Sequence, residues 1–250
     1  MSTPYDSYDY LSYWEDRSFE DDCERLVIEQ FLKKIGQRQA IVDIGGGFGR
    51  LLTVYAPFFK KCVIADPSAK LLEIGQNLNK EIKNVSFKKA SLPKLPFKGK
   101  SFDVVLMVRV SHHLTSLSPS FKEISRLLKD RGFLILEVAN KIHFVARLRA
   151  FLAGDFSFAK DQSSIERRSP KSIRHQTIAF SNHHPQKVLN DLKEAGFSTK
   201  LIFSVSNFRH PLFKKIFPTR LLLFLEDCLQ APLGRLFFGP SLFILAQKEK

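Results

Sequence analysis

The stretch "IVDIGGGFGRLL" at residues 41–52 decides the fold of this 250-residue chain. An apolar run carries the carboxylate of Asp43 and leads through Gly45, Gly46 and Gly47 into a segment with helical spacing. Glycine is a poor residue inside a strand or helix because it loses the most backbone entropy on folding. A strand, a bare turn and a helix in this order are typical of doubly wound sheets, which bind ligands beyond the carboxyl ends of their strands.

Two common glycine motifs do not fit this stretch. The dinucleotide fingerprint G-x-G-x-x-G needs a glycine where this chain has Arg50, and a P-loop needs a G-K-[S/T] that does not follow. The pattern that is present is D-x-G-x-G-x-G, formed by Asp43, Gly45, Gly47 and Gly49. The glycine pattern therefore excludes a binding site for a nicotinamide or flavin dinucleotide. A ligand that contains a nucleoside is still expected at this turn.

Short apolar runs alternate with helical segments from residue 40 onward, which predicts βαβ units on a parallel sheet. Strands are expected at 40–44, 62–66, 85–90, 102–110, 133–139, 198–206 and 241–249. Helices are expected at 19–35, 50–59, 67–82, 119–129, 142–152 and 184–197, with "DRG" (130–132) as a turn. The last two strands are expected to form a hairpin-like edge. The predicted fold is a doubly wound, Rossmann-like, seven-stranded and mostly parallel sheet, with helices on both faces and helical cap insertions.

A domain of 250 residues buries roughly three quarters of its unfolded surface, so neither a disulfide nor a bound metal is needed to stabilise it. We expect one domain over 1–250, with a helical lead-in at 1–39 and a cofactor-binding core at 40–140. Residues 141–183 and 207–239 break the alternation and are expected to cap the site. The three cysteines have no metal-ligand spacing and read as reduced thiols of a cytoplasmic protein without a metal site.

The glycine motif resembles motif I of the class I S-adenosylmethionine-dependent methyltransferases (type 11-like). Asp66, at the end of the next apolar run, matches the family's ribose carboxylate, and "SLPKLPFKGKSFDVVLMVRVSHHL" (91–114) is similar to its third-to-fourth strand stretch. "LLKDRGFLILEV" (127–138) and "LNDLKEAGF" (189–197) resemble its fifth-strand entry and late helix. The resemblance covers about half of the chain and implies the fold, S-adenosyl-L-methionine as cofactor, and methyl transfer.

The resemblance also implies a set of cofactor-binding residues. They are Arg17, Asp43, Gly45, Gly46, Gly47, Asp66, Pro67, Ser91, Leu92, Met107, Val108 and Arg109. Asp43 is expected to serve the cofactor's amine side and to fix the turn through backbone amides. Gly46 stands where the family tolerates several small residues. Ser91 replaces the family's acidic residue, so adenine recognition is expected to rest on the Leu92 amide.

Several of these residues also have plain structural interpretations. Asp66 could cap the following helix instead of binding ribose. Arg109 could form an ion pair instead of binding the cofactor carboxylate. Tyr13, Trp14 and Arg17 could form a lid over the cofactor, or their helix could simply pack on the sheet.

His112 and His113 follow the fourth strand and are the candidate catalytic residues. A histidine at the rim of the site could deprotonate a hydroxyl acceptor, and a base is needed only if the acceptor starts protonated. The alternative is that "HHL" is a structural helix start.

The acceptor is not given by any motif, but charge narrows its class. A net charge of +14 and interleaved phenylalanines fit polyanions or an anionic lipid surface. The leading hypothesis is a small hydrophobic or lipid-like acceptor, with peripheral contact between a cytoplasmic protein and an anionic membrane. The alternatives are an RNA (tRNA or rRNA) methyltransferase, a non-catalytic cofactor-binding partner subunit, and a basic surface that has no anionic partner.

Overall fold

The computed structural model describes residues 10–174 and 177–250, so residues 1–9 of the expected lead-in and residues 175–176 of the first insertion lie outside the description. The strands are β1 (Arg38–Ile44), β2 (Phe59–Asp66), β3 (Val85–Lys89), β4 (Phe102–Met107), β5 (Leu128–Ala139), β6 (Ile165–Glu166), β7 (Ser181–Asn182), β8 (Phe197–Val205) and β9 (Ser241–Lys248). The α-helices are α1 (Tyr10–Glu15), α2 (Ser18–Ile35), α3 (Leu52–Tyr55), α4 (Ala69–Leu78), α5 (Ser118–Leu127), α6 (Phe144–Leu152), α7 (Pro170–Arg174), α8 (Pro185–Glu194), α9 (Pro211–Ile216) and α10 (Thr219–Gly234). Two 3₁₀ turns are η2 (Ala56–Phe58) and η3 (Ser111–His113). Among the described residues, none of these helices is long and apolar enough to cross a membrane.

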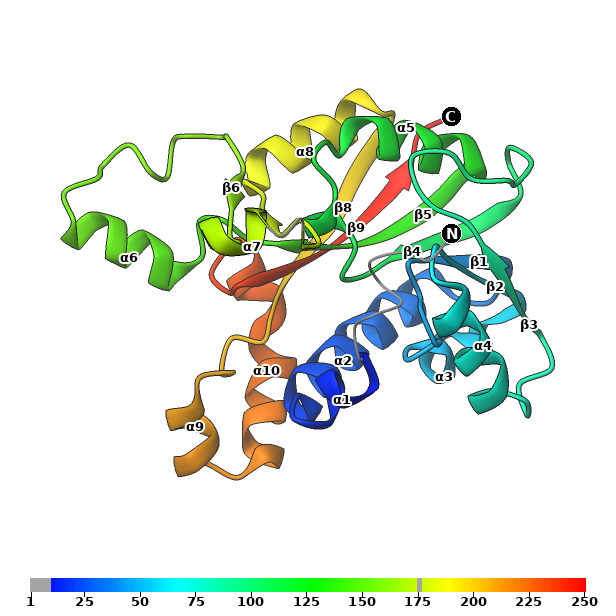
Figure 1. Ribbon diagram of the computed structural model, residues 1–250, viewed down its shortest axis with the longest axis horizontal. Helices are drawn as coiled ribbons and strands as arrows, with labels where there is room; N and C mark the ends of the chain where they lie inside the picture. Colours follow the sequence, from blue (N-terminus) through cyan, green and yellow to red (C-terminus); the bar gives the residue numbers. More distant parts are fainter. Residues whose placement is uncertain (1–9, 175–176) are drawn as a thin grey trace.

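A seven-stranded sheet forms the centre of the molecule, with strand order β3-β2-β1-β4-β5-β9-β8 (Figure 1). β9 runs antiparallel to both of its neighbours, and the other neighbouring pairs are parallel. The predicted doubly wound, mostly parallel sheet and its hairpin-like edge are confirmed. The strand order reverses between β1 and β4, which is where such sheets bind their ligands.

Helices cover both faces of this sheet because successive strand residues point to opposite sides. Ile41 belongs to the core beneath α2, α3 and α10, while Val42 belongs to the core beneath α5 and α8 (Figure 1). α2 packs through a buried stripe that includes Phe31, whose ring lies 4.9 Å from that of Phe203 on β8. The expected lead-in helix is therefore an integral layer of the fold.

Three local expectations differ from the structure. The helix expected at 50–59 is only the short α3 followed by η2, because β2 already begins at Phe59. The residues "DRG" (130–132), expected as a turn, lie inside β5 as a bulge. Phe102 of β4 pairs with Leu128 of β5, whereas Val104, two residues later, pairs with Phe133. The first insertion contains the two-residue strands β6 and β7, which are too short to leave an alternation pattern in the sequence.

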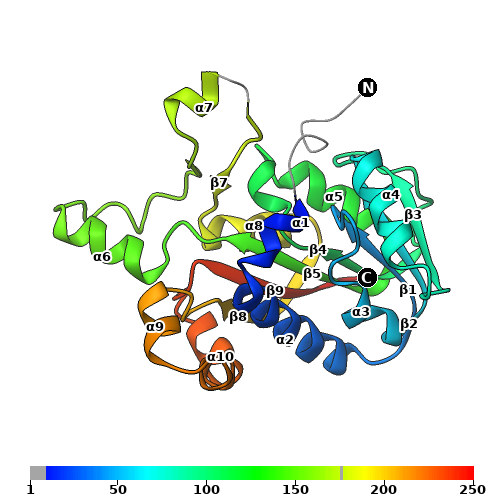
Figure 2. The ribbon, with the colours of Figure 1, turned by 60° about the horizontal axis from the view of Figure 1, so that its bottom comes forward.

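The second insertion packs on the body of the fold. α10 lies against α2 and β8, where Gln230 Nε2 donates to the carbonyl of Cys23 at 3.1 Å. Gln30 Nε2 on α2 donates to Asp227 Oδ1 at 2.6 Å. These contacts place α10 as a covering layer of the sheet (Figure 2).

Candidate functional site

A cavity of about 670 Å³ opens at the carboxyl ends of β1, β2 and β4. This volume lies within the range of about 300–1,000 Å³ that is usual for small-molecule sites. Its walls come from the glycine turn, the end of β2, the segment after β4, helix α1 and the segment before β7. The lining residues are Tyr10, Tyr13, Trp14, Asp43, Gly45, Gly46, Gly47, Phe48, Arg50, Leu51, Asp66, Pro67, Leu71, Val108, Arg109, Val110, His112, His113, Thr177, Ile178 and Phe180.

The three glycines of the turn face different surroundings. A Cβ on Gly45 would clash with the side chain of Val110, and one on Gly46 would lie 2.7 Å from Asp43 Cγ. At Gly47 the nearest atom would be 3.6 Å away, on Leu71, an ordinary van der Waals distance, so no neighbour crowds this position at the cavity wall. Position 46 therefore does not accommodate the small side chains that the family resemblance implied, because any Cβ there would displace the Asp43 carboxylate.

Asp66 holds the glycine turn in place. Its Oδ2 accepts a hydrogen bond from the Gly47 amide at 2.9 Å, and its Oδ1 accepts one from the Ser68 amide at 2.8 Å. The cap of α4 is Ser68, whose Oγ accepts from the Leu71 amide at 3.1 Å. The turn amide is therefore bound by Asp66 and not by Asp43 as expected, since this amide is directed toward the end of β2.

Asp43 occupies a more apolar environment at the cavity floor. Only 2% of its surface is exposed, and its Oδ2 accepts a hydrogen bond from the Tyr55 hydroxyl at 3.2 Å. Burial raises the pKa of Asp43 to about 7, against the opposing effects of Tyr55 and the Arg50 charge. Its charge therefore changes near neutral pH.

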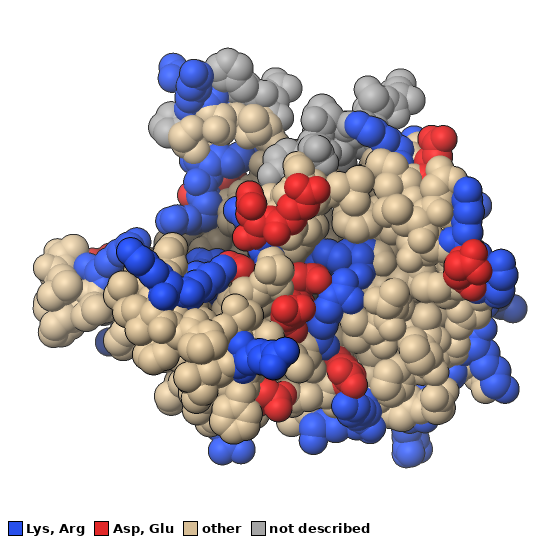
Figure 3. All heavy atoms as spheres, turned by 90° about the horizontal axis from the view of Figure 1, so that it is seen from below, with Lys and Arg blue, Asp and Glu red and all other residues tan. Residues whose placement is uncertain are grey.

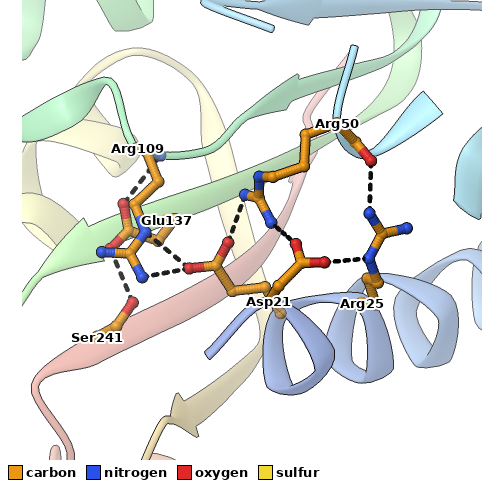
Figure 4. A network of polar contacts seen from close by, with 7 residues as sticks. Asp21, Arg25, Arg50, Arg109, Glu137 and Ser241 are labelled. Carbon is orange, nitrogen blue, oxygen red and sulfur yellow. Dashed lines mark hydrogen bonds and ion pairs between the residues drawn. The ribbon is translucent and has the colours of Figure 1, made fainter. Parts of the chain in front are cut away.

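A buried carboxylate on α2 joins the two arginines of the cavity wall. Glu24 is completely buried; its Oε1 accepts from Arg109 Nε at 2.6 Å and its Oε2 from Arg50 Nη2 at 2.6 Å (Figure 4). Arg50 also pairs with Asp21, one helical turn away. Arg109 therefore forms an ion pair with Glu24. This is the structural interpretation given above as the alternative to binding the cofactor carboxylate.

The backbone at Arg109 is held in an uncommon conformation. Its φ is 60°, in the left-handed region that non-glycine residues rarely adopt. Its amide donates to Glu137 Oε2 at 3.1 Å, and Glu137 Oε1 accepts from the Ser241 hydroxyl at 2.7 Å (Figure 4). β5 and β9 therefore support the turn that follows β4.

Helix α1 forms an aromatic wall of the cavity. The guanidinium of Arg50 lies 3.7 Å from the ring centroid of Trp14, within the range of a cation–π contact. Arg17 is not part of the cavity lining; its guanidinium lies 4.0 Å from the Tyr13 ring and donates to the Tyr13 carbonyl at 3.1 Å. The two interpretations of the lead-in each describe one part: α1 lines the cavity, while α2 packs on the sheet.

The two candidate catalytic histidines lie together at the cavity wall. Their ring centroids are 4.0 Å apart, and Phe180 lies 4.5 Å from His112. His113 Nδ1 donates to the carbonyl of Ala179 at 2.7 Å, because a carbonyl can only accept. Burial lowers the pKa of His113, and burial with the nearby His113 and Arg109 lowers that of His112 well below 6.5. Both rings are therefore neutral at physiological pH.

Two neighbouring histidines have structural roles. His183 Nε2 donates to the carbonyl of Ser111 at 3.0 Å and so fixes the turn that carries His112 and His113. His184 caps α8 by accepting from the Gln186 amide at 3.2 Å.

Besides Arg17, three residues expected at the cofactor do not line the cavity. Met107 is fully buried in the core under α5, because it points to the opposite side of β4 from its neighbour Val108. Ser91 and Leu92 lie outside the lining, and no lining residue comes from 207–239. Residues 177–180 line the cavity and belong to the insertion 141–183 that was expected to cap the site. Sequence reasoning missed Arg50 as a wall residue and its partner Glu24. No cluster of metal-ligating side chains is found in the described ranges.

Replacing Glu24 tests the ion network. Glu24→Ala removes the carboxylate that Arg50 and Arg109 share, although both guanidinium groups are partly buried. We therefore expect a loss of about 3–5 kcal/mol in the free energy of unfolding. The matched control is Glu29→Ala on the same helix, whose pair with Lys33 is exposed and should contribute about 0–1 kcal/mol. Denaturant unfolding measures both variants, and equal losses would contradict the assigned role of Glu24.

Comparisons with known proteins find a family model and relatives that this chain resembles. Residues 42–136 match the family model described as "Methyltransferase domain". A curated relative, the uncharacterized methyltransferase YcgJ of Bacillus subtilis, is 28% identical over 38% of this chain, and the match spans only 39% of YcgJ. The ubiquinone/menaquinone biosynthesis C-methyltransferase UbiE of Pseudomonas paraeruginosa is 28% identical over 70% of each chain.

Solved structures show the same fold. The crystal structure of YcgJ has a TM-score of 0.57 at 15% identity, covering 91% of this chain and 99% of YcgJ. A chain in the complex between the Trm112 methyltransferase activator and a methyltransferase of Haloferax volcanii has a TM-score of 0.62 at 16% identity, covering 97% of this chain and 99% of that one. The family match begins just before the glycine turn, and together with the methyltransferase-named relatives and the shared fold it supports a class I S-adenosylmethionine-dependent methyltransferase.

Proposed function

We propose that this methyltransferase acts on a small, hydrophobic acceptor whose methylated group carries an ionisable proton. The observation that carries the proposal is the pair of neutral imidazoles, His112 and His113, in the same cavity as the glycine turn. Aromatic and apolar side chains of α1 and of residues 177–180 surround the pair, which favours a hydrophobic acceptor over RNA. Relatives named for ubiquinone and menaquinone biosynthesis also fit such an acceptor.

The residues at the cavity floor fit S-adenosylmethionine. Gly47 lines the cavity without a side chain, so a flat nucleoside or a methionine chain can approach its backbone closely. Asp66 lines the cavity, and a carboxylate oxygen can accept more than one hydrogen bond, which suits two ribose hydroxyls. Asp43 offers its carboxylate to the ammonium group. When bound, S-adenosylmethionine supplies a methyl group already activated by its sulfonium.

The remaining proposed contacts follow from the lining. Gly45, Gly46 and Pro67 shape the floor, and Val108 and Arg109 stand at the end of β4. Arg50 is paired with Glu24 and Asp21, and Arg109 is paired with Glu24, so we expect both to contribute shape and orientation. The proposed set leaves out Arg17, Ser91, Leu92 and Met107, which do not line the cavity. The proposed cap consists of α1 and residues 177–180 of the insertion 141–183.

His113 is the proposed proton acceptor. With Nδ1–H bonded to Ala179, the lone pair of the neutral ring lies on Nε2, which can take the proton of an acceptor hydroxyl as the new bond to carbon forms. His112, neutral and nearly buried, packs beside it and keeps its ring in place. The apolar walls exclude water and position the acceptor, and positioning is the main requirement of an in-line methyl transfer.

Asp66→Ala should weaken binding of S-adenosylhomocysteine by at least about tenfold, because hydrogen bonds to a charged group contribute ~1.5–3 kcal/mol. Calorimetry with the 2′-deoxy analogue separates ribose binding from support of the turn. Wild-type protein should bind the analogue more weakly than the parent compound, whereas Asp66→Ala should bind both alike.

Ser68→Ala is the matched control for that experiment. It removes the cap of α4 at a cost of about 1 kcal/mol of stability. It should nevertheless keep the preference for the ribose hydroxyl. A variant at Asp66 that retained the full preference would show that the ribose lies elsewhere.

Cofactor affinity should depend on pH through Asp43. Its pKa of about 7 means that acidification through neutrality protonates the carboxyl and removes its attraction for the ammonium group. We expect the Kd of S-adenosylhomocysteine to rise as the pH falls from about 8 to about 6. Asp43→Asn, neutral throughout, should bind weakly with a flat profile, and a steep profile in that variant would assign the effect to another group.

His113→Gln should lower kcat by about 10²–10⁴-fold, the usual contribution of a general base. The assay supplies methyl-labelled S-adenosylmethionine and a panel of hydrophobic phenols and quinols, and counts label in the organic phase. His210→Gln is the control, since His210 caps α9 outside the cavity. Equal rates for wild type and His113→Gln on every labelled acceptor would remove the base from the mechanism.

A further inference from the structure

Helix α6 carries an apolar stripe that faces solvent. Phe144, Val145, Leu148, Phe151 and Leu152 recur at the spacing that places them on one side of a helix. All five are exposed, with Phe151 at 64% and Leu152 at 75%. α6 has no buried residue, so this stripe is not packed against the core.

Positive charge borders the stripe. α6 contains Arg147 and Arg149 and no acidic residue. Together with Arg167 and Arg209, these arginines surround His143 at the start of the helix: burial and then their charges lower the pKa of His143 to about 4. Within the described residues, no ion pair joins any of the four arginines to a carboxylate. Among residues 10–174 and 177–250, no carboxylate therefore lies within ion-pair distance of this cluster.

The helix projects from the body of the molecule, at the end opposite β3 (Figures 1 and 2). Its first turn is fixed: the Phe144 ring stacks on Phe238 with centroids 5.0 Å apart, and the Phe144 amide donates to the Phe238 carbonyl at 2.8 Å. At this end Lys and Arg stand among uncharged side chains, while most acidic side chains of that view lie nearer its middle (Figure 3).

Helix α9 adds a second exposed apolar segment at the same end (Figures 1 and 2). Leu212 and Ile216 are 56% and 60% exposed, and Lys214 and Lys215 lie between them in sequence. Lys214 also pairs with Glu20, which ties α9 to α2. Two separate helices therefore present the same combination of apolar and basic side chains.

We propose that α6 docks on the surface of an anionic lipid bilayer, with its apolar stripe among the outer acyl chains and Arg147 and Arg149 at the phosphates. A projecting helix with an apolar stripe flanked by cations suits a flat interface that is apolar below and anionic above. RNA would satisfy the arginines but would leave five large apolar side chains without an apolar partner. A protein groove would satisfy the stripe but would have to supply carboxylates to the arginine cluster as well.

The docking surface is connected to the cavity. The Arg167 amide, at the edge of the arginine cluster, donates to the carbonyl of Phe180 at 2.7 Å, and Phe180 lines the cavity. Docking would thus place the cavity wall near the lipid from which a hydrophobic acceptor can be drawn. This last step rests on the proposed function, whereas the docking itself does not.

Vesicle flotation tests the docking with neither cofactor nor acceptor present, so its failure would leave methyl transfer untouched. Wild-type protein should float with phosphatidylcholine vesicles that contain phosphatidylglycerol and remain behind with pure phosphatidylcholine. Leu152→Glu should reduce the partition coefficient by about tenfold or more, the effect of losing one buried leucine. Arg149→Gln should reduce it about fivefold and weaken its dependence on salt.

Leu78→Glu is the matched control, because Leu78 on α4 is 62% exposed and lies on another helix. It should float like the wild type, and all three variants should keep the wild-type thermal unfolding temperature and affinity for S-adenosylhomocysteine. Equal flotation of Leu152→Glu and wild type would overturn the proposal. So would a dimer in light scattering that Leu152→Glu dissociates, or binding to an RNA oligonucleotide without any flotation.

Discussion

The buried carboxylate of Glu24 is the interaction on which the architecture of the site depends. It links α2 to the turn after β1 through Arg50 and to the turn after β4 through Arg109, so three segments far apart in sequence share one charge. Arg50 in turn supports the indole of Trp14, and with it the aromatic wall formed by α1. Isolated cations at this depth would be costly, and the shared carboxylate lets both guanidinium groups stand at the cavity edge.

Burial acts in opposite directions on the two ends of the cavity. It raises the pKa of the Asp43 carboxyl on the floor and lowers those of the His112 and His113 rings on the wall. In both cases the apolar surroundings disfavour the charged form. The same cavity thus combines a carboxyl that is easily neutralised with imidazoles that stay neutral, which suits a ligand that brings its own positive charge.

The sequence predicts the sheet and the position of the site, because these follow from local patterns. The apolar runs give the strands; Asp43 lies near the end of one strand, the glycines follow it, and Asp66 ends the next. The sequence does not predict the partners of these residues. Glu24 and Arg109 lie 85 positions apart, and the strand pairs that bring them together are visible only in three dimensions. Met107 illustrates a smaller limit: the side of a strand that a residue faces depends on register, which a motif match does not give.

The placement of β9 has a consequence for the order in which the protein is assembled. β8 has its sheet partner in β9, which follows it in the chain, and β9 separates it from β5. During synthesis, residues 197–205 therefore have to wait for residues 241–248 before they can join the sheet. Ser241 on β9 also completes the support of Glu137 under the turn at Arg109. A nascent chain that stops short of β9 lacks this support, so the cavity is completed only after β9 has been made.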